Sequence, residues 1–347
     1  MKKEILIAIG ITILFLGTFI TPSVAIDNVN KTSIPTSSGN TLYVGGSGEG
    51  NYTKIQDAID DAYDGDTVFV FDDSSPYYEH VIIDKSIYLV GEEKNTTIID
   101  GSGSGHVVTL AENGITLNGF TIQKGGPYGS FHSGVCIRSN HNTVNNNKIL
   151  NSGNGIITED ASNNIISENI ISGNGRGIMI REESNDNSIT RNTIIGNTGG
   201  VDLQNIGSLN PSNNIVSWNN IKDNPLLGIT TESQNKLVIS HNNIENSDIG
   251  ISLATSQLAK VKFNNFINLV TNASFVLCYG VHWWRNYWNK PMFLPKAIHG
   301  YNVIIVPPFR FPDDIKFINW YHFDWRPALK PYDITDYKVE RRRYNAE

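Results

Sequence analysis

Charged side chains recur at one position of a short motif that repeats along the middle of the chain. Arg138, Glu159 and Arg181 follow successive Gly-aliphatic motifs, and Asp202 lies within the next one. If these motifs are strands stacked one above another, the two arginines flank the glutamate on an outward face. Such a stack is typical of a surface ladder of ion pairs, which contributes little to stability. The alternative is a shallow groove for an acidic or neutral glycan, with Asp202 at its edge.

Catalysis on this surface would require acids and bases that converge on one bond. Glycoside hydrolysis uses two carboxylates, and the candidates are Glu159, Asp160, Glu182, Glu183 and Asp202. When the repeats are aligned, no outward column stacks two of these carboxylates on adjacent units. The clustered calcium ligands and the Arg or Lys base of polysaccharide lyases are not visible either. Catalytic residues stay unassigned, and a non-catalytic protein is favoured over a polysaccharide hydrolase or lyase.

Metal ligands do not form a recognisable pattern. His132 and His241 are isolated in the sequence, and Cys278 and His282 have a ligand-like spacing without a second pair. Cys136 and Cys278 lie far apart, so no disulfide framework is expected, although export would permit one bridge. The three methionines are too few for a methionine-rich copper site. We therefore expect no metal and no cofactor.

The elements that would position these residues form an internal repeat. One asparagine anchors each unit, with Ile or Val three residues before it and Ile or Phe two residues after it. Stacked about 4.8 Å apart, these side chains would form an amide ladder that also satisfies backbone groups at each bend. We interpret the column as structural and not as a polar binding strip. The anchors are Asn118, Asn147, Asn169, Asn192, Asn219, Asn242 and Asn264.

Short strands and tight turns fill each unit. Apolar residues alternate after the repeated glycine, as in Gly177-Ile178-Met179-Ile180, which is typical of strands with one buried face. No helical pattern occurs across residues 107–277, so the crossover helices of ordinary parallel α/β folds are excluded. The units must then stack directly, because one coil alone cannot offset the conformational entropy of ordering its residues. We expect an all-β chain that folds as a right-handed parallel β-helix.

The segments on either side of the repeat are expected to cover the open ends of this solenoid. Thr53-Lys54-Ile55-Gln56 has the pattern of a capping box, and it predicts a short capping helix over residues 54–63. The β-helix is expected over residues 41–277, and aromatic and proline residues crowd residues 278–347. We interpret this last segment as an aromatic C-terminal cap and tail. The alternative is a platform for sugar rings, for which Trp283 and Trp288 are candidates.

The first residues indicate export. Residues 1–25 have the pattern of a signal peptide, with Lys2 and Lys3 before an apolar run and small residues ending at Ala25. An uncleaved membrane anchor is the alternative, and it would be the protein's one contact with a membrane. Residues 26–40 are expected to be a flexible polar leader. The protein is then a monomer in the extracellular space, at the cell surface or in a periplasm-like compartment.

The charge of the chain restricts its partners. The formal net charge is −7, and Arg341, Arg342 and Arg343 form the only basic block. Nucleic acid is therefore excluded as an expected partner. A polysaccharide or a cell-surface glycan is the partner that remains.

Several motifs before and within the repeat are distinctive. They are Ile55-Gln56-Asp57-Ala58-Ile59, residues 85–92, residues 95–101, Gly119-Phe120-Thr121-Ile122 and the Asn-x-Ile repeats. Over about residues 41–277 they resemble the NosD-like family, right-handed β-helix proteins named after a periplasmic protein of nitrous-oxide reductase maturation. The resemblance implies a fold shared with carbohydrate-binding and sugar-hydrolase domains, and the C-terminal segment resembles exported archaeal members. The family label also implies copper handling and an accessory role in metalloenzyme maturation, which the ligand inventory of this sequence does not match.

Overall fold

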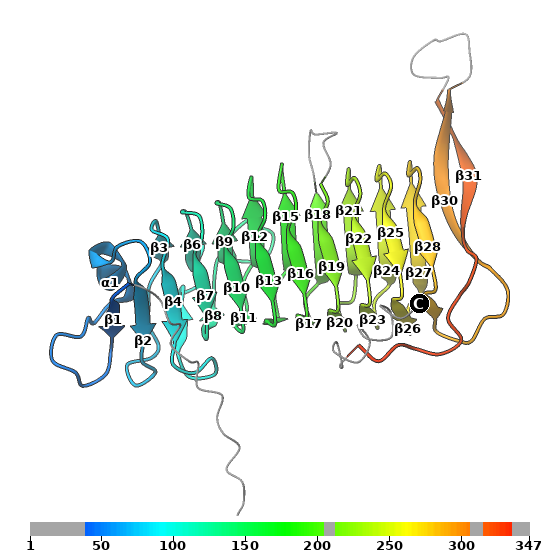
Figure 1. Cartoon of the computed structure of the whole chain (residues 1–347). Helices are drawn as coiled ribbons and strands as arrows, with labels where there is room; N and C mark the ends of the chain where they lie inside the picture. Colours follow the sequence, from blue (N-terminus) through cyan, green and yellow to red (C-terminus); the bar gives the residue numbers. More distant parts are fainter. Residues whose placement is uncertain (1–38, 205–211, 306–314, 335–347) are drawn as a thin grey trace, which may run out of the picture. The chain divides into compact units, whose positions relative to one another are not determined.

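The computed structural model describes residues 39–204, 212–305 and 315–334 of the chain. The expected signal peptide, nearly all of the expected leader and the arginine triplet at 341–343 lie outside these residues. Within them the strands stack as successive parallel coils (Figure 1), so the predicted parallel β-helix is confirmed. In these ranges no helix has the length and hydropathy that a bilayer crossing requires.

Most coils contribute three short strands, and equivalent strands of neighbouring coils pair in parallel. The first stack consists of β1 (Thr41–Val44), β2 (Thr67–Val70), β4 (Tyr88–Gly91), β7 (Thr116–Asn118), β10 (Thr143–Asn145), β13 (Ile165–Ser167), β16 (Ser188–Thr190), β19 (Ile215–Ser217), β22 (Val238–Ser240), β25 (Lys260–Lys262) and β28 (His282–Trp284). The second consists of β5 (Ile98–Asp100), β8 (Thr121–Gln123), β11 (Lys148–Leu150), β14 (Ile170–Ser172), β17 (Thr193–Ile195), β20 (Asn220–Lys222), β23 (Asn243–Glu245), β26 (Asn265–Ile267) and β29 (Tyr287–Trp288).

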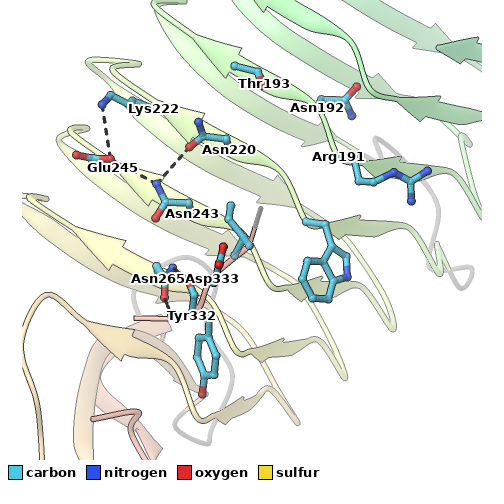
Figure 2. A pocket seen from close by; sticks show the side chains of 12 residues that line it. Arg191, Asn192, Thr193, Asn220, Lys222, Asn243, Glu245, Asn265, Tyr332 and Asp333 are labelled. Carbon is cyan, nitrogen blue, oxygen red and sulfur yellow. Dashed lines mark hydrogen bonds and ion pairs between the residues drawn. The ribbon is translucent and has the colours of Figure 1, made fainter. Parts of the chain in front are cut away.

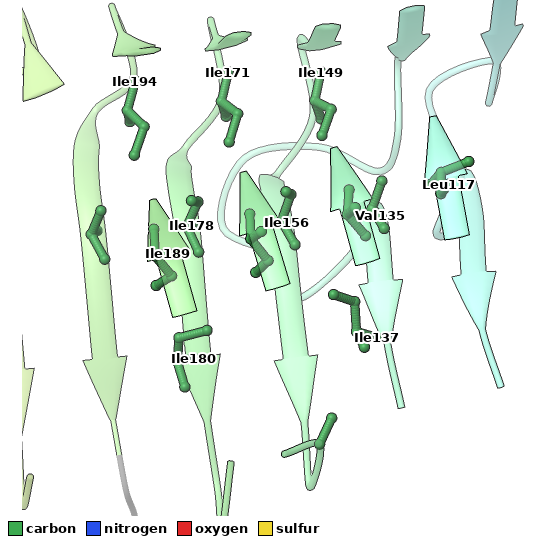
Figure 3. Packing of buried hydrophobic residues seen from close by; sticks show 14 of the residues in the cluster. Leu117, Val135, Ile137, Ile149, Ile156, Ile171, Ile178, Ile180, Ile189 and Ile194 are labelled. Atoms are coloured by element: carbon green, nitrogen blue, oxygen red, sulfur yellow. The ribbon is translucent and has the colours of Figure 1, made fainter. Parts of the chain in front are cut away.

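The third stack carries the Gly-aliphatic motifs. It consists of β3 (Val81–Ile83), β6 (Val108–Leu110), β9 (Ser133–Ile137), β12 (Asn154–Glu159), β15 (Arg176–Arg181), β18 (Gly199–Gln204), β21 (Leu227–Glu232), β24 (Ile249–Ala254) and β27 (Thr271–Val276). Aliphatic side chains from all three stacks meet inside the coils (Figure 3), and Ile156, Ile171 and Ile189 are each fully buried. Each such side chain contributes about 1.5–3 kcal/mol by leaving water.

A ladder of buried asparagines runs along one corner of the coils from Asn147 to Asn286. At each step the side-chain Oδ1 of one asparagine accepts hydrogen bonds from the backbone N–H and the Nδ2 of the asparagine one coil earlier. Asn169 donates both bonds to Asn192 at 3.0 Å. The six anchors from Asn147 to Asn264 lie in this ladder, which includes Asn286 as a further member.

Asn118 does not belong to the ladder, and its assignment as an anchor is wrong. It pairs in register with Asn145, two residues before the ladder position. Phe120 occupies that position in its coil and donates its backbone N–H to Asn147 Oδ1 at 3.1 Å. Gly119 supplies the left-handed backbone angle of this corner with φ of 85°, so the corner is a Gly-Phe pair and carries no asparagine.

The N-terminal helix α1 (Ile55–Asp61) forms where a helix was predicted, and Ile55, Ala58 and Ile59 are buried against the early coils. The predicted capping box is wrong, because the N-cap residue Lys54 makes no side-chain capping bond. Glu79 caps the helix instead: its two carboxylate oxygens accept the backbone N–H groups of Ile55 and Gln56 at 2.9 and 3.0 Å. A carboxylate at this end also complements the helix dipole.

At the C-terminal end the coils extend beyond residue 277. Trp283 pairs with Val261, and Trp288 pairs with Phe266, so both tryptophans occupy inward positions of a further coil. Each is 2% exposed. Neither ring is available to stack on a sugar, and the interpretation of these two residues as a sugar platform is wrong.

A long antiparallel hairpin follows this coil and projects from it (Figure 1), formed by β30 (Lys296–Ile305) and β31 (Ile315–Asp324). It joins the solenoid through a parallel pairing of Phe275 with Gly300 and of Trp283 with Asp324. The hairpin thus pairs with part of the last sheet edge, and the capping role of residues 278–347 stays a prediction. Several of its aromatic side chains are exposed: Tyr301, Phe317, Trp320, Tyr321 and Phe323.

Candidate functional site

The predicted stack of charges exists on the third strand stack. The Arg138 Nε lies 2.9 Å from Glu159 Oε2, and the Arg181 Nη1 lies 3.5 Å from Glu159 Oε1. The strand register places Glu159 opposite Arg181 on the next coil. Ligand binding by these three residues stays a prediction, and their side chains already pair with one another.

The alternation predicted that Asp202 would be exposed at the edge of this surface. In the structure Asp202 is buried, with only 5% of its surface exposed. Its Oδ2 accepts hydrogen bonds from Arg176 Nε at 2.7 Å and Gln204 Nε2 at 3.1 Å. Burial raises the pKa of the Asp202 carboxyl, and the adjacent Arg176 guanidinium opposes that shift. The outward neighbours Cys136, Ile157 and Met179 are also buried, in a small cluster of their own.

A segment between β8 and β9, residues 124–132, lies over part of the same face. It crosses the outward face of the strands: Asn154 Nδ2 donates to the carbonyl oxygens of Ser130 and His132 at 3.2 and 3.3 Å. The Phe131 ring lies 4.1 Å from the guanidinium carbon of Arg181. Burial raises the pKa of the Cys136 thiol to about 12, so this cysteine stays protonated and is a poor nucleophile or metal ligand.

His132 is isolated in the sequence, but in the structure it lies beside a second histidine. Its ring makes an edge contact with His106, with 5.4 Å between the ring centroids. The two ring nitrogens of His106 lie 2.9 Å from Ser133 Oγ and 3.4 Å from Arg138 Nη2. Burial and the nearby Arg138 lower the pKa of His106.

Two carboxylates do face each other on adjacent coils, contrary to the expectation from the aligned repeats. The pairing of Glu159 with Arg181 brings the residues that follow them, Asp160 and Glu182, to equivalent positions. Burial and the neighbouring Asp160 carboxylate raise the pKa of Glu182. Alignment on the Gly-aliphatic motif, continued one residue past its end, would have found this pair.

A cavity lies elsewhere in the described residues, on the outward face of the second strand stack. It is a groove of about 520 Å³ along β17, β20, β23 and β26 (Figure 2). Its lining residues are Arg191, Asn192, Thr193, Trp218, Asn220, Lys222, Asn243, Glu245, Asn265, Tyr332, Asp333 and Ile334. None of these was a candidate ligand contact in the sequence, and Asn192 was placed only in the ladder.

A row of polar side chains forms the floor of this groove. Thr193, Asn220, Asn243 and Asn265 occupy one register position on four successive strands. Asn243 Nδ2 donates to Asn220 Oδ1 at 3.2 Å, which leaves further donors and acceptors on both amides. The next outward column pairs Lys222 Nζ with Glu245 Oε2 at 3.8 Å.

An aromatic column borders the same groove. Trp218 stacks on His241 with ring centroids 4.3 Å apart, and His241 stacks on Phe263 at 5.0 Å. These three residues precede the ladder residues Asn219, Asn242 and Asn264, and each has a left-handed backbone with φ between 56° and 61°. The repeat therefore brings them into one column, and His241 is not isolated.

The comparison with protein families decides the affiliation of the chain. The family model of NosD, described as a periplasmic copper-binding protein, matches residues 36–304. The chain belongs to the NosD family. No curated protein matches the chain.

Two solved structures that resemble this NosD-family chain are named for carbohydrates. XylC in complex with xylose has a TM-score of 0.58 and 11% identity, over 75% of this chain and 71% of that one. The A-module of the mannuronan C-5 epimerase AlgE6 from Azotobacter vinelandii has a TM-score of 0.51 and 15% identity, over 67% and 87%. At these identities the likeness shows a common fold.

The family description implies a bound copper ion, and the side chains of this NosD-family chain show whether they could hold one. In residues 39–204, 212–305 and 315–334, no group of three or more His, Cys, Asp or Glu side chains is arranged to hold a metal ion. His106 lies beside His132, but both nitrogens of His106 already face protein partners and one of these is the cation of Arg138. The described residues do not fit a copper site.

Proposed function

We propose that this chain is an exported, non-catalytic β-helix protein that binds a neutral polysaccharide in the groove along β17, β20, β23 and β26. The observation that supports it is the row of Thr193, Asn220, Asn243 and Asn265 on the groove floor. Strand pairing repeats these groups about every 4.8 Å along the solenoid axis. A regular row of this kind suits an extended ligand with a repeating structure better than a single small molecule.

The side-chain types match a hydroxyl-rich ligand. Each asparagine amide carries both a donor and an acceptor, and a sugar hydroxyl can serve as either. Trp218, at the side of the groove, adds apolar area for the C–H groups of a sugar. Ligand sites commonly combine apolar area with a few oriented polar groups in this way.

The charges favour a neutral glycan over a strongly acidic one. Arg191 and Lys222 contribute two positive charges to the groove lining, and Glu245 and Asp333 contribute two negative charges. The chain as a whole carries a formal charge of −7, which repels polyanions at a distance. A neutral polysaccharide is repelled neither by the groove carboxylates nor by the net charge of the chain.

The pair of Asp160 and Glu182 favours a second function, that of a polysaccharide hydrolase. Glycoside hydrolysis needs a carboxyl with a raised pKa as general acid, and Glu182 is a candidate for that role. This pair lies on the third strand stack, away from the groove floor on the second. Hydrolysis would therefore depend on Glu182, and binding in the groove would not.

Polysaccharide binding by the full chain, screened on an array of neutral and acidic polysaccharides and followed by calorimetry, tests the proposal. Asn243→Ala and Trp218→Ala should each weaken binding of a neutral polysaccharide about tenfold, the effect of losing about 1.4 kcal/mol. Lys148→Ala is the matched control, because Lys148 occupies the same outward column on β11, outside the groove. Absence of binding, or equal affinity of the groove variants and the native chain, would overturn the proposal.

Product analysis on any bound polysaccharide separates binding from hydrolysis. We expect no shortened products after prolonged incubation. Products that are lost in Glu182→Gln would establish the hydrolase function and contradict a non-catalytic protein.

A further inference from the structure

The hairpin of β30 and β31 has one covered face and one open face. Its pairing register puts Ile298 opposite His322 and, one step along each strand, His299 opposite Tyr321. On the covered face Ile298 is buried, and the His322 ring stacks on Phe275 with 3.9 Å between the ring centroids. Side chains alternate between the two sides of a strand, so His299 and Tyr321 point to the opposite, open face.

Aromatic side chains dominate this open face. The His299 ring centroid lies 5.0 Å from that of Tyr301 and 5.3 Å from that of Tyr321. Phe317 is 63% exposed and Tyr321 is 52% exposed. An exposed apolar surface made of neighbouring side chains marks an interaction site. By strand register the open face comprises His299, Tyr301, Phe317, Asn319, Tyr321 and Phe323.

The backbone of β31 limits how deeply this face can enter a partner. Among the described strands, β31 pairs with β30 along its length but with β28 only at Asp324. The other edge of β31 therefore carries backbone N–H and C=O groups that need water or a polar partner. Such groups are excluded from the hydrocarbon of a bilayer. They are compatible with its headgroup region, where aromatic side chains with a polar end are enriched.

The segment that contains the hairpin is basic, whereas the chain as a whole is acidic. Residues 290–330 include six Lys or Arg and three Asp, a local charge of +3, against −7 for the chain. In the described part of this segment the only carboxylate, that of Asp324, is buried, while Lys290, Arg326 and Lys330 are exposed. Anionic headgroups attract a basic surface. A second copy of this chain would bring the same local charge to the contact and would be repelled.

We propose that the open face of the hairpin docks the protein on the surface of an anionic lipid bilayer. The rings of Tyr301, Phe317 and Tyr321 enter the headgroup region, and the basic side chains of the segment are attracted to the lipid phosphates. The contact is peripheral, because the free edge of β31 stays hydrated. Docking does not depend on the groove of the second strand stack. A chain that has both activities holds a polysaccharide at a membrane surface.

Cosedimentation of the full chain with lipid vesicles tests the docking. We expect partition at least about tenfold stronger into mixed phosphatidylglycerol and phosphatidylcholine vesicles than into phosphatidylcholine alone. Raising the ionic strength from about 0.1 M to about 1 M should remove this preference, because the screening length falls from about 10 Å to about 3 Å. Equal partition into the two kinds of vesicle would overturn the proposal without any variant.

Variants of the open face show whether the hairpin is responsible. Phe317→Ser/Tyr321→Ser should reduce partition into the anionic vesicles about tenfold, since two exposed rings are lost. Tyr301→Ser, on the neighbouring strand, is an independent variant and should reduce it about threefold. Tyr63→Ser/Tyr78→Ser is the matched control, because both tyrosines are exposed and lie outside the hairpin. The apolar run at residues 5–20 is present in every variant, so differences among the variants report on the hairpin. Native partition in both open-face variants would overturn the proposal.

Sedimentation velocity without lipid separates docking from self-association. We expect a monomer. A dimer that Phe317→Ser/Tyr321→Ser converts to monomers would assign the open face to a second copy and overturn the proposal. Vesicle binding without polysaccharide binding would support docking and remove the proposed function, and the reverse result would remove docking alone.

Discussion

The carboxylate of Asp324 ends the asparagine ladder at Asn286. Its Oδ2 accepts the backbone N–H of Asn286 at 2.8 Å and the Asn286 Nδ2 at 3.1 Å. The amides of the ladder all donate toward this end, so their dipoles add and leave unsatisfied donors at the last coil. A negative charge is the natural terminator of such a column, as it is at the N-terminus of a helix.

Asp324 should therefore be one of the most sensitive positions for stability. It is fully buried, and it also accepts N–H groups from Arg285, Arg326 and the Trp288 indole. Asp324→Ala would leave these donors without a partner, and we expect a loss of about 3–5 kcal/mol. Asp324→Asn should cost less, because one acceptor oxygen remains. Urea unfolding measures both, with the exposed Asp248→Ala as control; equal midpoints for Asp324→Ala and the control would contradict this role.

The stacking of coils was predictable because it depends on periodicity alone. Ile166, Ile189 and Val216 stand three residues before their anchors and pair in register on successive strands. The same logic failed at Asn118, where a Gly-Phe corner replaces the usual left-handed residue and asparagine. Local spacing could not reveal that offset, because Asn118 has the same kinds of apolar neighbours as the true anchors.

The candidate site was less predictable because it depends on what covers each face. Alternation correctly placed Cys136 and Asp202 on the outward side of the coils, but it could not show that residues 124–132 cross that side. The aromatic column was accessible in principle, since Trp218, His241 and Phe263 each precede a repeated asparagine. The contact of Asn265 with Tyr332 was not, because 67 residues separate the two in the sequence.

The offset of Asn118 leads to a paired prediction. Asn192 is 1% exposed, and its Nδ2 donates to the Ile166 carbonyl oxygen and to Asn219 Oδ1 at 2.9 and 3.0 Å. Asn192→Ala should cost about 2–4 kcal/mol, since it strands buried groups on both neighbouring coils. Asn118→Ala removes only a partly exposed contact with Asn145 and should cost less than about 1 kcal/mol. Similar losses in thermal unfolding would contradict the register.

An inward charge tests the core directly. Ile194 is fully buried between Ile171 and Ile221 on adjacent coils. Ile194→Asp places an unpaired carboxylate among aliphatic side chains and should cost several kcal/mol. Ile195→Asp is the control, because its side chain is partly exposed on the opposite face of the same strand. Unchanged circular dichroism and melting temperature for Ile194→Asp would show that the inward assignment is wrong.

The stacked ring of His241 makes stability depend on pH. Burial, and then the nearby Lys262, lower its pKa to about 4 in the folded chain, against about 6.5 in the unfolded chain. The unfolded state therefore binds more protons between these values. The contribution to stability is complete above about pH 6.5 and is lost as the pH falls toward 4. We expect a loss on the order of 2 kcal/mol, discounted because the ring is partly exposed. His241→Phe keeps a ring between Trp218 and Phe263 but cannot titrate. Between pH 7 and pH 4.5, the urea midpoint should fall further for the native chain than for this variant. Equal falls in the two proteins would rule out His241 as the titrating group.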